Sequence, residues 1–227
     1  MTALSAFLRG HWQLLGLAAA IFALWQTPLV LPLKLLVVLF HELSHMAMAK
    51  LTGGTVESLS VNLRQGGEVW TRGGSRFLIL SAGYLGSLLI GVGLFLAALR
   101  STADRMVLGA LGALLLAVLL LYVRDLVAVL IVGATGGALL VGARVLPARA
   151  CDLALRVIGL TSMIYVPYDI FDDTLRRSSE RSDARMLAEE VGGPTVFWGG
   201  LWFLIALAVI AWTLRHALGR SSNLRLR

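Results

Sequence analysis

Seven apolar segments of about 20 residues each dominate this 227-residue sequence. An α-helix needs about 20 apolar residues to cross a bilayer, so each segment is long enough to span a membrane. Hydrophobic residues make up 58% of the chain and charged residues 15%, whereas soluble domains have about 45–50% and about 25%. The sequence therefore predicts an all-α polytopic membrane protein with about six to seven transmembrane helices. The expected spans cover residues 12–30, 31–51, 77–99, 106–123, 125–145, 151–168 and 195–218.

The second apolar segment contains His41-Glu42-Leu43-Ser44-His45, which matches the HExxH signature. On a helix, histidines four residues apart share one face and can bind one zinc ion together. Glu42 lies beside the first histidine, where it can act as general base toward a water molecule. Four histidines and six glutamates in the chain predict roughly 0.002 chance matches to the motif. The motif therefore indicates zinc-dependent hydrolysis inside a membrane, where unpaired polar side chains are costly.

Residues 55–72 have a different pattern from the apolar segments around them. Leu59, Val61 and Leu63 alternate with polar residues, and this period of two predicts a strand. Gln65-Gly66-Gly67 supplies a turn, and residues 68–72 form a second short strand. We therefore expect a membrane-associated β-hairpin directly after the HExxH helix, with a plain polar loop as the alternative.

A catalytic zinc site usually has three protein ligands and a fourth position for water. The chain has one cysteine and no further well-placed histidine, so a carboxylate is expected to be the third ligand. The candidates that end the sixth apolar segment are Asp169, Asp172 and Asp173. Their spacing would place them on one helix face, although arginines follow directly, as at a solvated helix end. The glutamates that would serve a different HExxH architecture are Glu180, Glu189 and Glu190.

An HExxH in an early membrane helix, a short hairpin and a distal aspartate together resemble the site-2 protease family of intramembrane zinc metalloproteases. In that family the aspartate of a Leu-Asp-Gly motif, preceded by prolines, completes the zinc site. Pro167-Tyr168-Asp169-Ile170 is the closest match in this chain. The resemblance therefore implies Asp169 as the third ligand, with Asp172 and then Asp173 as alternates.

The resemblance also implies one integral-membrane metalloprotease domain over residues 1–227. Its parts are the HExxH helix (31–51), the hairpin (55–72) and the Asp-motif segment (151–176). The family's glycine is missing from the second motif, and Arg176-Arg177 and Ser182-Asp183-Ala184 follow it. This arrangement resembles a divergent branch of the family with an Asp-rich second motif.

The implied function is hydrolysis of peptide bonds in membrane-embedded substrates, with Zn²⁺ as the cofactor and Glu42 as the general base. Expected partners are transmembrane proteins and the lipid bilayer of a multi-pass protein, in the plasma membrane of a prokaryote. Nucleic acid is not an expected partner, because the net charge of +7 is spread over short loops that meet anionic lipid. By analogy with the family, the hairpin edge at residues 58–63 would hold unwound substrate by strand addition.

Two other kinds of function are compatible with the sequence. A catalytically silent scaffold or chaperone of the same fold would bind membrane partners without cleaving them. A transporter would use intramembrane polar residues, and Arg124, Asp125 and Arg156 are the candidates to line its path.

Overall fold

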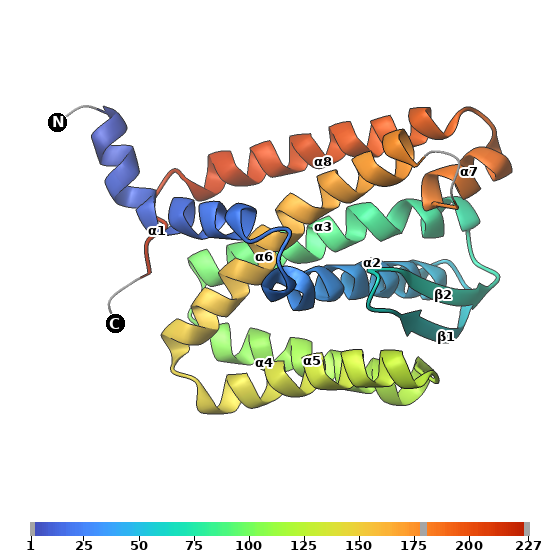
Figure 1. Cartoon of the computed structure of the whole chain (residues 1–227), viewed down its shortest axis with the longest axis horizontal. Helices are drawn as coiled ribbons and strands as arrows, with labels where there is room; N and C mark the ends of the chain where they lie inside the picture. Colours follow the sequence, from blue (N-terminus) through green and yellow to red (C-terminus); the bar gives the residue numbers. More distant parts are fainter. Residues whose placement is uncertain (1–2, 178–180, 225–227) are drawn as a thin grey trace.

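The computed structural model describes residues 3–177 and 181–224, which form a bundle of eight α-helices with one β-hairpin (Figure 1). The helices are α1 (Ala3–Ala23), α2 (Leu31–Leu51), α3 (Arg76–Arg100), α4 (Asp104–Tyr122), α5 (Leu126–Val145), α6 (Ala148–Phe171), α7 (Asp183–Val191) and α8 (Thr195–Ala217). A 3₁₀ turn, η1 (Pro28–Val30), precedes α2, and a π-helical turn, η2 (Asp172–Arg176), follows α6. The hairpin consists of β1 (Thr55–Val61) and β2 (Gly67–Arg72).

Six of these helices are long and apolar enough to cross a membrane, which confirms a polytopic all-α membrane protein. They are α2, α3, α4, α5, α6 and α8. The segment expected as a first span at 12–30 folds differently, because α1 begins at Ala3 and ends before Pro28 starts η1. Helix α1 is not among the six, since Arg9, His11 and Gln13 interrupt its apolar run.

Helix α2 lies in the interior of the bundle, against α3 and α6 (Figure 1). About two thirds of its apolar window is buried (67%), compared with 17% for α8 and 22% for α5. Residues 35–40 of α2 are buried on every side, as expected for a helix that is apolar all round. The HExxH motif follows this run and is therefore enclosed by protein.

Glycines allow the helices to approach closely at two crossings. A Cβ on Gly159 of α6 would lie 2.7 Å from the carbonyl oxygen of Gly91 on α3. A Cβ on Gly112 of α4 would likewise lie 2.8 Å from the carbonyl oxygen of Gly136 on α5. Any larger residue would push the paired helices apart, so these glycines serve packing, as small residues do between membrane helices.

The predicted hairpin is confirmed as an antiparallel pair with Thr55 opposite Arg72. Leu59 points into the core and also forms a parallel bridge with Val123, which covers part of the outer edge of β1. Within the described residues, β2 is therefore the edge that has no strand beside it. The free edge is β2, in contrast to the edge at residues 58–63 that the sequence analysis assigns to substrate.

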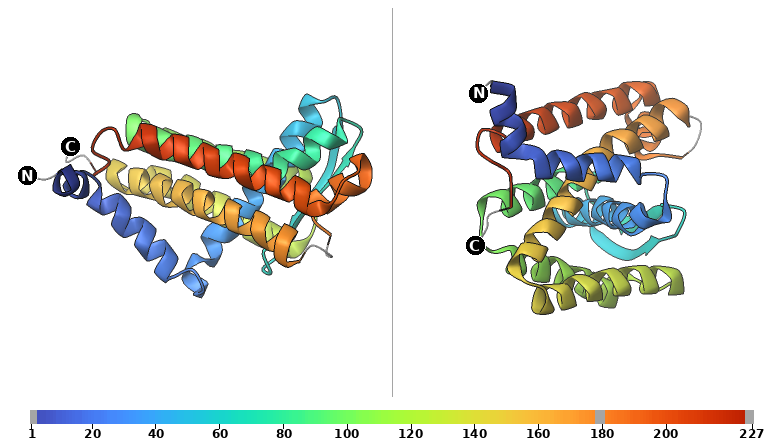
Figure 2. Two further views of the ribbon diagram at one scale, coloured as in Figure 1. Left: turned by 90° about the horizontal axis from the view of Figure 1, so that it is seen from above. Right: turned by 60° about the vertical axis from the view of Figure 1, so that its left-hand side comes forward.

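The bundle has two distinct ends. Figures 1 and 2 show the hairpin and α7 together at one end, and both chain termini at the other. The second half of α2, which carries the HExxH motif, runs toward the end with the hairpin.

Candidate metal centre

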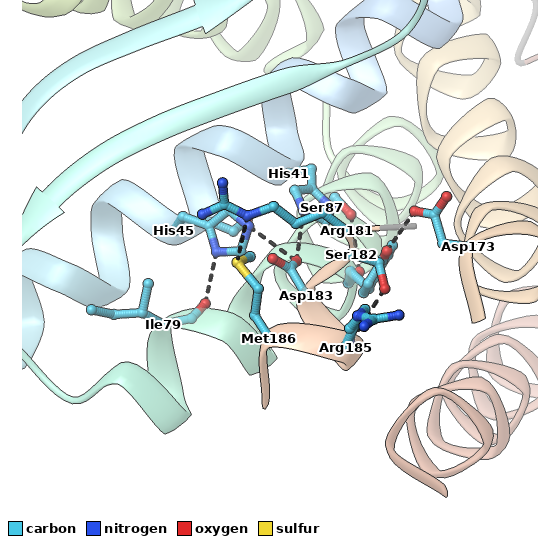
Figure 3. Close-up of polar contacts among 12 residues, drawn as sticks. His41, His45, Ile79, Ser87, Asp173, Arg181, Ser182, Asp183, Arg185 and Met186 are labelled. Atoms are coloured by element: carbon cyan, nitrogen blue, oxygen red, sulfur yellow. Dashed lines mark hydrogen bonds and ion pairs between the residues drawn. The ribbon is translucent and has the colours of Figure 1, made fainter. Parts of the chain in front are cut away.

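His41 and His45 lie one helical turn apart on α2, with ring centroids 4.6 Å apart. The Nδ1 atom of His45 donates to the carbonyl oxygen of Ile79 on α3 at 2.7 Å, because a carbonyl oxygen can only accept. This bond fixes the ring so that Nε2 keeps its lone pair for a metal. Figure 3 shows both imidazoles turned toward the start of α7.

Gly83 on α3 makes room for the two rings. A Cβ at this position would lie 2.6 Å from Cε1 of His41 and 2.6 Å from Cε1 of His45. Any side chain at residue 83 would therefore displace both imidazoles. Gly86 faces Ser44 in the same way, since its Cβ would lie 2.5 Å from the Ser44 Cβ. Two glycines thus bring α3 against the HExxH turn.

Asp183, the first residue of α7, places a carboxylate between the two histidines. Its Oδ2 lies 2.9 Å from Nε2 of His41 and 3.1 Å from Nε2 of His45 (Figure 3). The Ser182 hydroxyl caps α7 by accepting from the backbone N–H of Arg185 at 3.3 Å. Asp183 therefore lies in the first helical turn, where the helix dipole favours a negative charge.

The carboxylate of Asp183 is charged and paired with both histidines. Burial opposes its ionisation, but His45 and His41 beside it hold the pKa of Asp183 well below its usual range. Its Oδ2 is buried and forms ion pairs with both rings. A cation bound between the three side chains would take the place of the histidine protons in these pairs.

The three side chains fit a tetrahedral zinc site. One ligand atom from each of His41, His45 and Asp183 lies within 4.8 Å of the others. Bonds of about 2.0–2.1 Å to zinc would separate two ligand atoms by about 3.3 Å in tetrahedral geometry. The observed separations of 2.9 and 3.1 Å are slightly shorter, so a small side-chain movement would admit the ion. Three protein ligands leave a fourth position for water.

Glu42 lies next to this group and is buried without a full set of partners. Its Oε2 has no hydrogen-bond partner in the part of the chain that the structure describes. Gly67, at the start of β2, approaches so closely that a Cβ there would lie 2.7 Å from the Glu42 Cγ. The hairpin can therefore close over Glu42 only because residue 67 is glycine.

The expected third ligand, Asp169, and its alternates Asp172 and Asp173 do not belong to the group of ligand atoms around the histidines. Asp183 lies beside the histidines instead and is the carboxylate of this candidate group, whereas Asp169 as the third ligand stays a prediction from the sequence. The physical reason is the path of the chain, because α6 ends in η2 and the first turn of α7 is the segment that reaches the histidines. Figure 3 shows Asp173 apart from both imidazoles.

Two of the expected aspartates are bound to other side chains. Asp172 accepts from Arg177 at 2.8 Å, and Asp173 accepts from Arg177 at 2.6 Å. Asp173 also accepts from the hydroxyl of Tyr84 at 2.6 Å. The Tyr84 ring makes an edge-on contact with His41, with centroids 4.7 Å apart. Asp173 therefore supports the site indirectly through Tyr84, a residue that the sequence analysis did not single out.

The alternative glutamate donors are also placed elsewhere. Glu189 pairs with Arg185 at 2.9 Å, and Glu190 pairs with Arg76 at 2.6 Å. Glu180 lies outside the described residues. Neither described glutamate belongs to the group around the histidines.

A cavity of about 960 Å³ gives access to the site. Its walls include the three possible metal ligands, Glu42 and the start of β2. Asp169 also lines the cavity, from the last turn of α6. This volume lies within the usual range for ligand pockets, about 300–1,000 Å³. The cavity can hold water and a segment of unfolded peptide beside Glu42.

These features define a multi-pass membrane protein with a buried His-His-Asp group and a glutamate beside it. A family model described as Peptidase M50B-like matches residues 14–213. The chain belongs to this family, which is a site-2 protease family whose members are generally zinc metalloproteases. Comparisons with curated proteins and with solved structures give no match.

Proposed function

We propose that the protein is an intramembrane zinc metalloprotease that hydrolyses peptide bonds of membrane-embedded substrates. The observation that carries the proposal is the Asp183 oxygen, buried and charged between two histidine Nε2 atoms at 2.9 and 3.1 Å. His41, His45 and Asp183 would hold the ion. Bound zinc supplies a Lewis acid that polarises the scissile carbonyl and makes water more acidic.

The residues of the chain have separate parts in this reaction. Glu42 takes a proton from the attacking water and passes it to the leaving amine. The Ile79 carbonyl keeps His45 in the tautomer that presents Nε2. Gly67 and Gly83 keep the space around Glu42 and the imidazoles free of side chains.

The substrate must unwind, because peptide bonds in a transmembrane helix are hydrogen-bonded and shielded from water. Strand β2 lines the cavity beside Glu42 and offers an unpaired edge. We propose that unwound substrate adds to β2, which would satisfy its backbone groups near the catalytic residues. The proposed substrates are transmembrane proteins that share the bilayer with the enzyme, as expected for the plasma membrane of a prokaryote.

The polar residues that a transporter would need have structural partners. Arg124 donates to the carbonyl oxygens that end α4, at 2.6 Å for Leu121 and 2.8 Å for Val123. Asp125 caps α5 by accepting from the backbone N–H of Ala128 at 2.8 Å. Arg156 pairs with Asp152 at the other end of the bundle. These contacts favour the protease over a transport path.

The proposed function is tested by replacing the general base. We expect purified wild-type protein in detergent to cleave transmembrane peptides, and Glu42→Gln to reduce turnover by about 10²–10⁴-fold while it retains zinc. Glu57→Gln, which alters an exposed hairpin carboxylate paired with Arg72, is the matched control and should keep normal turnover. Cleavage products are measured by mass spectrometry and zinc by elemental analysis.

Two results would contradict parts of this proposal, the first the protease activity and the second the role of Glu42. Folded wild-type protein that contains zinc but cleaves none of a broad set of transmembrane peptides would favour the silent scaffold. Unchanged turnover in Glu42→Gln would show that another residue transfers the proton.

A further inference from the structure

Lys34 is a charged residue in a place where charge is costly. It lies in the membrane-spanning segment Pro28–Leu51 and is only 9% exposed. Its side chain lines the same cavity as His41 and Glu42. Charged side chains inside membrane spans are normally paired or face a functional site.

The ammonium group of Lys34 has an aromatic partner and, among the described residues, no anionic one. Its Nζ lies 4.6 Å from the ring centroid of Trp25, which precedes α2. Among the described residues, no carboxylate lies within 4.0 Å of it, and Asp169 of the same cavity is not paired with it. A cation–π contact only partly offsets the cost of taking an ammonium group out of water.

The surroundings of Lys34 suit a carboxylate with apolar neighbours. The Trp25 ring packs against Tyr165 and Tyr168 of α6, each at 6.0 Å between centroids. Figure 2 shows α1 and α2 diverging from the turn that carries Trp25. Lys34 is therefore a cation beside aromatic rings, unlike the arginines that line the rest of the cavity, and this setting matches an acidic side chain within an apolar peptide.

The spacing of Lys34 from the candidate metal centre sets where this carboxylate would lie. Lys34 and His41 are seven residues apart on α2, so they share a helix face at about 10 Å along the axis. The lysine side chain points back toward the N-terminus of the helix, which adds to this separation. An extended peptide advances about 3.3 Å per residue, so Lys34 is about three to four residues from the reacting bond.

We propose that Lys34 is a specificity subsite that binds an aspartate or glutamate side chain of the substrate, about three to four residues from the scissile bond. This inference rests on the proposed protease function. The carboxylate of the substrate pairs with the Lys34 ammonium, and the Tyr165 and Tyr168 rings, which line the same cavity, contact the apolar residues on either side of it. The enzyme then selects transmembrane segments that carry one acidic residue near an unwound site.

The test measures binding without cleavage. Zinc-loaded Glu42→Gln protein in detergent micelles is titrated with fluorescently labelled apolar peptides of about 24 residues, long enough to span a bilayer. Each pair of peptides differs only by Asp or Asn at one scanned position. We expect the Asp peptide to bind about tenfold more tightly at the favoured position, as for a hydrogen bond to a charged group.

Added to this background, Lys34→Gln should reduce the ratio of Asp to Asn affinity to about one, and Lys34→Arg should restore a preference for Asp. The matched control is Lys50→Gln, because Lys50 lies on the same helix over the Tyr122 ring at 5.2 Å but outside the cavity. It should leave the ratio unchanged. Equal binding of both peptides at every position, or a preference that persists in Lys34→Gln, would overturn the subsite.

The subsite and the protease can fail separately. Lys34-dependent preference in a protein that never cleaves would support the subsite and contradict the protease. Cleavage of Asp and Asn peptides at equal efficiency in otherwise wild-type protein would support the protease and contradict the subsite. Lys34-dependent binding of anionic phosphatidylglycerol without any preference for Asp would assign the ammonium to lipid and overturn the proposal.

Discussion

The two ends of the bundle each contain a buried polar cluster, and the two clusters are built differently. Near the chain termini, Nδ1 of His11 lies 2.8 Å from the hydroxyl of Ser222. Arg156 donates to Asp152 through two nitrogens and to the Ser222 carbonyl oxygen. Each charged group of this terminal cluster therefore has a partner.

The candidate metal centre at the other end leaves Oε2 of Glu42 buried without a hydrogen bond from the described residues, and its Asp183 carboxylate is paired with both histidines that could bind a metal. Asn223 in the terminal cluster also has an unbonded oxygen, but its amide is neutral and its nitrogen donates to the Arg9 carbonyl at 2.7 Å. A cluster whose charged groups pair with one another stabilises a fold, whereas a buried carboxylate oxygen without a hydrogen bond, beside converging metal-ligand atoms, indicates a binding site. The difference separates a structural cluster from a functional one.

Breaking the terminal cluster should produce the largest loss of stability. We expect Arg156→Met to lower the free energy of unfolding by about 3 kcal/mol, because it leaves the Asp152 carboxylate, which is only 14% exposed, without its partner. Thermal unfolding in detergent measures this change. The zinc content of the folded fraction should not change.

The control for this variant is Arg144→Met at an exposed position of α5, which should change the stability by less than about 0.5 kcal/mol. The double variant Arg156→Met with Asp152→Leu should recover much of the loss. Loss of zinc from folded Arg156→Met protein would show that the two clusters are coupled.

Filling the space at Gly83 should weaken metal binding without unfolding the chain. We expect Gly83→Ala to reduce zinc affinity by about 10–100-fold, as for residues that orient metal ligands, because both imidazoles must shift. Competition with a fluorescent chelator measures the affinity. Gly93→Ala on the same helix has no atom within 4 Å of the new Cβ and should leave the affinity unchanged. Equal affinities in the two variants would contradict the geometry of the site.

The smallest expected effect concerns the aspartates of η2. Asp173→Asn should lower zinc affinity by less than about threefold, because Asp173 acts on His41 only through Tyr84. Asp172→Asn should have no measurable effect, since its partners are Arg176 and Arg177. The same chelator competition applies. Loss of zinc from Asp173→Asn would indicate that this residue binds the metal. It would contradict the account in which Asp183 of α7 is the ligand and the aspartates after α6 are not.

The elements of the fold follow from sequence patterns that act locally. Helix α2 has the expected bounds because a largely apolar segment that follows Pro28 ends before Gly53 and Gly54. The hairpin follows from the alternation of Leu59 and Val61 with polar residues. Periodicity of this kind reports which face is buried, and it needs no knowledge of distant residues.

The third candidate ligand could not be predicted in this way, because it depends on how the chain turns after α6. Asp169, Asp172 and Asp173 are prominent in the sequence, but Arg177 and Tyr84 bind two of them. The available signal for Asp183 was Ser182 before a short amphipathic segment, which is typical of a helix N-cap. That signal predicts a carboxylate at a helix start and not its distance from the histidines.

The most direct test of the central claim is the zinc content of purified, folded variants. Wild-type protein should contain about one zinc per chain, and Asp183→Ala and His41→Ala should lose it. Asp169→Ala should keep about one zinc per chain. Full zinc in Asp183→Ala together with its loss from Asp169→Ala would contradict the account and return the third ligand to α6.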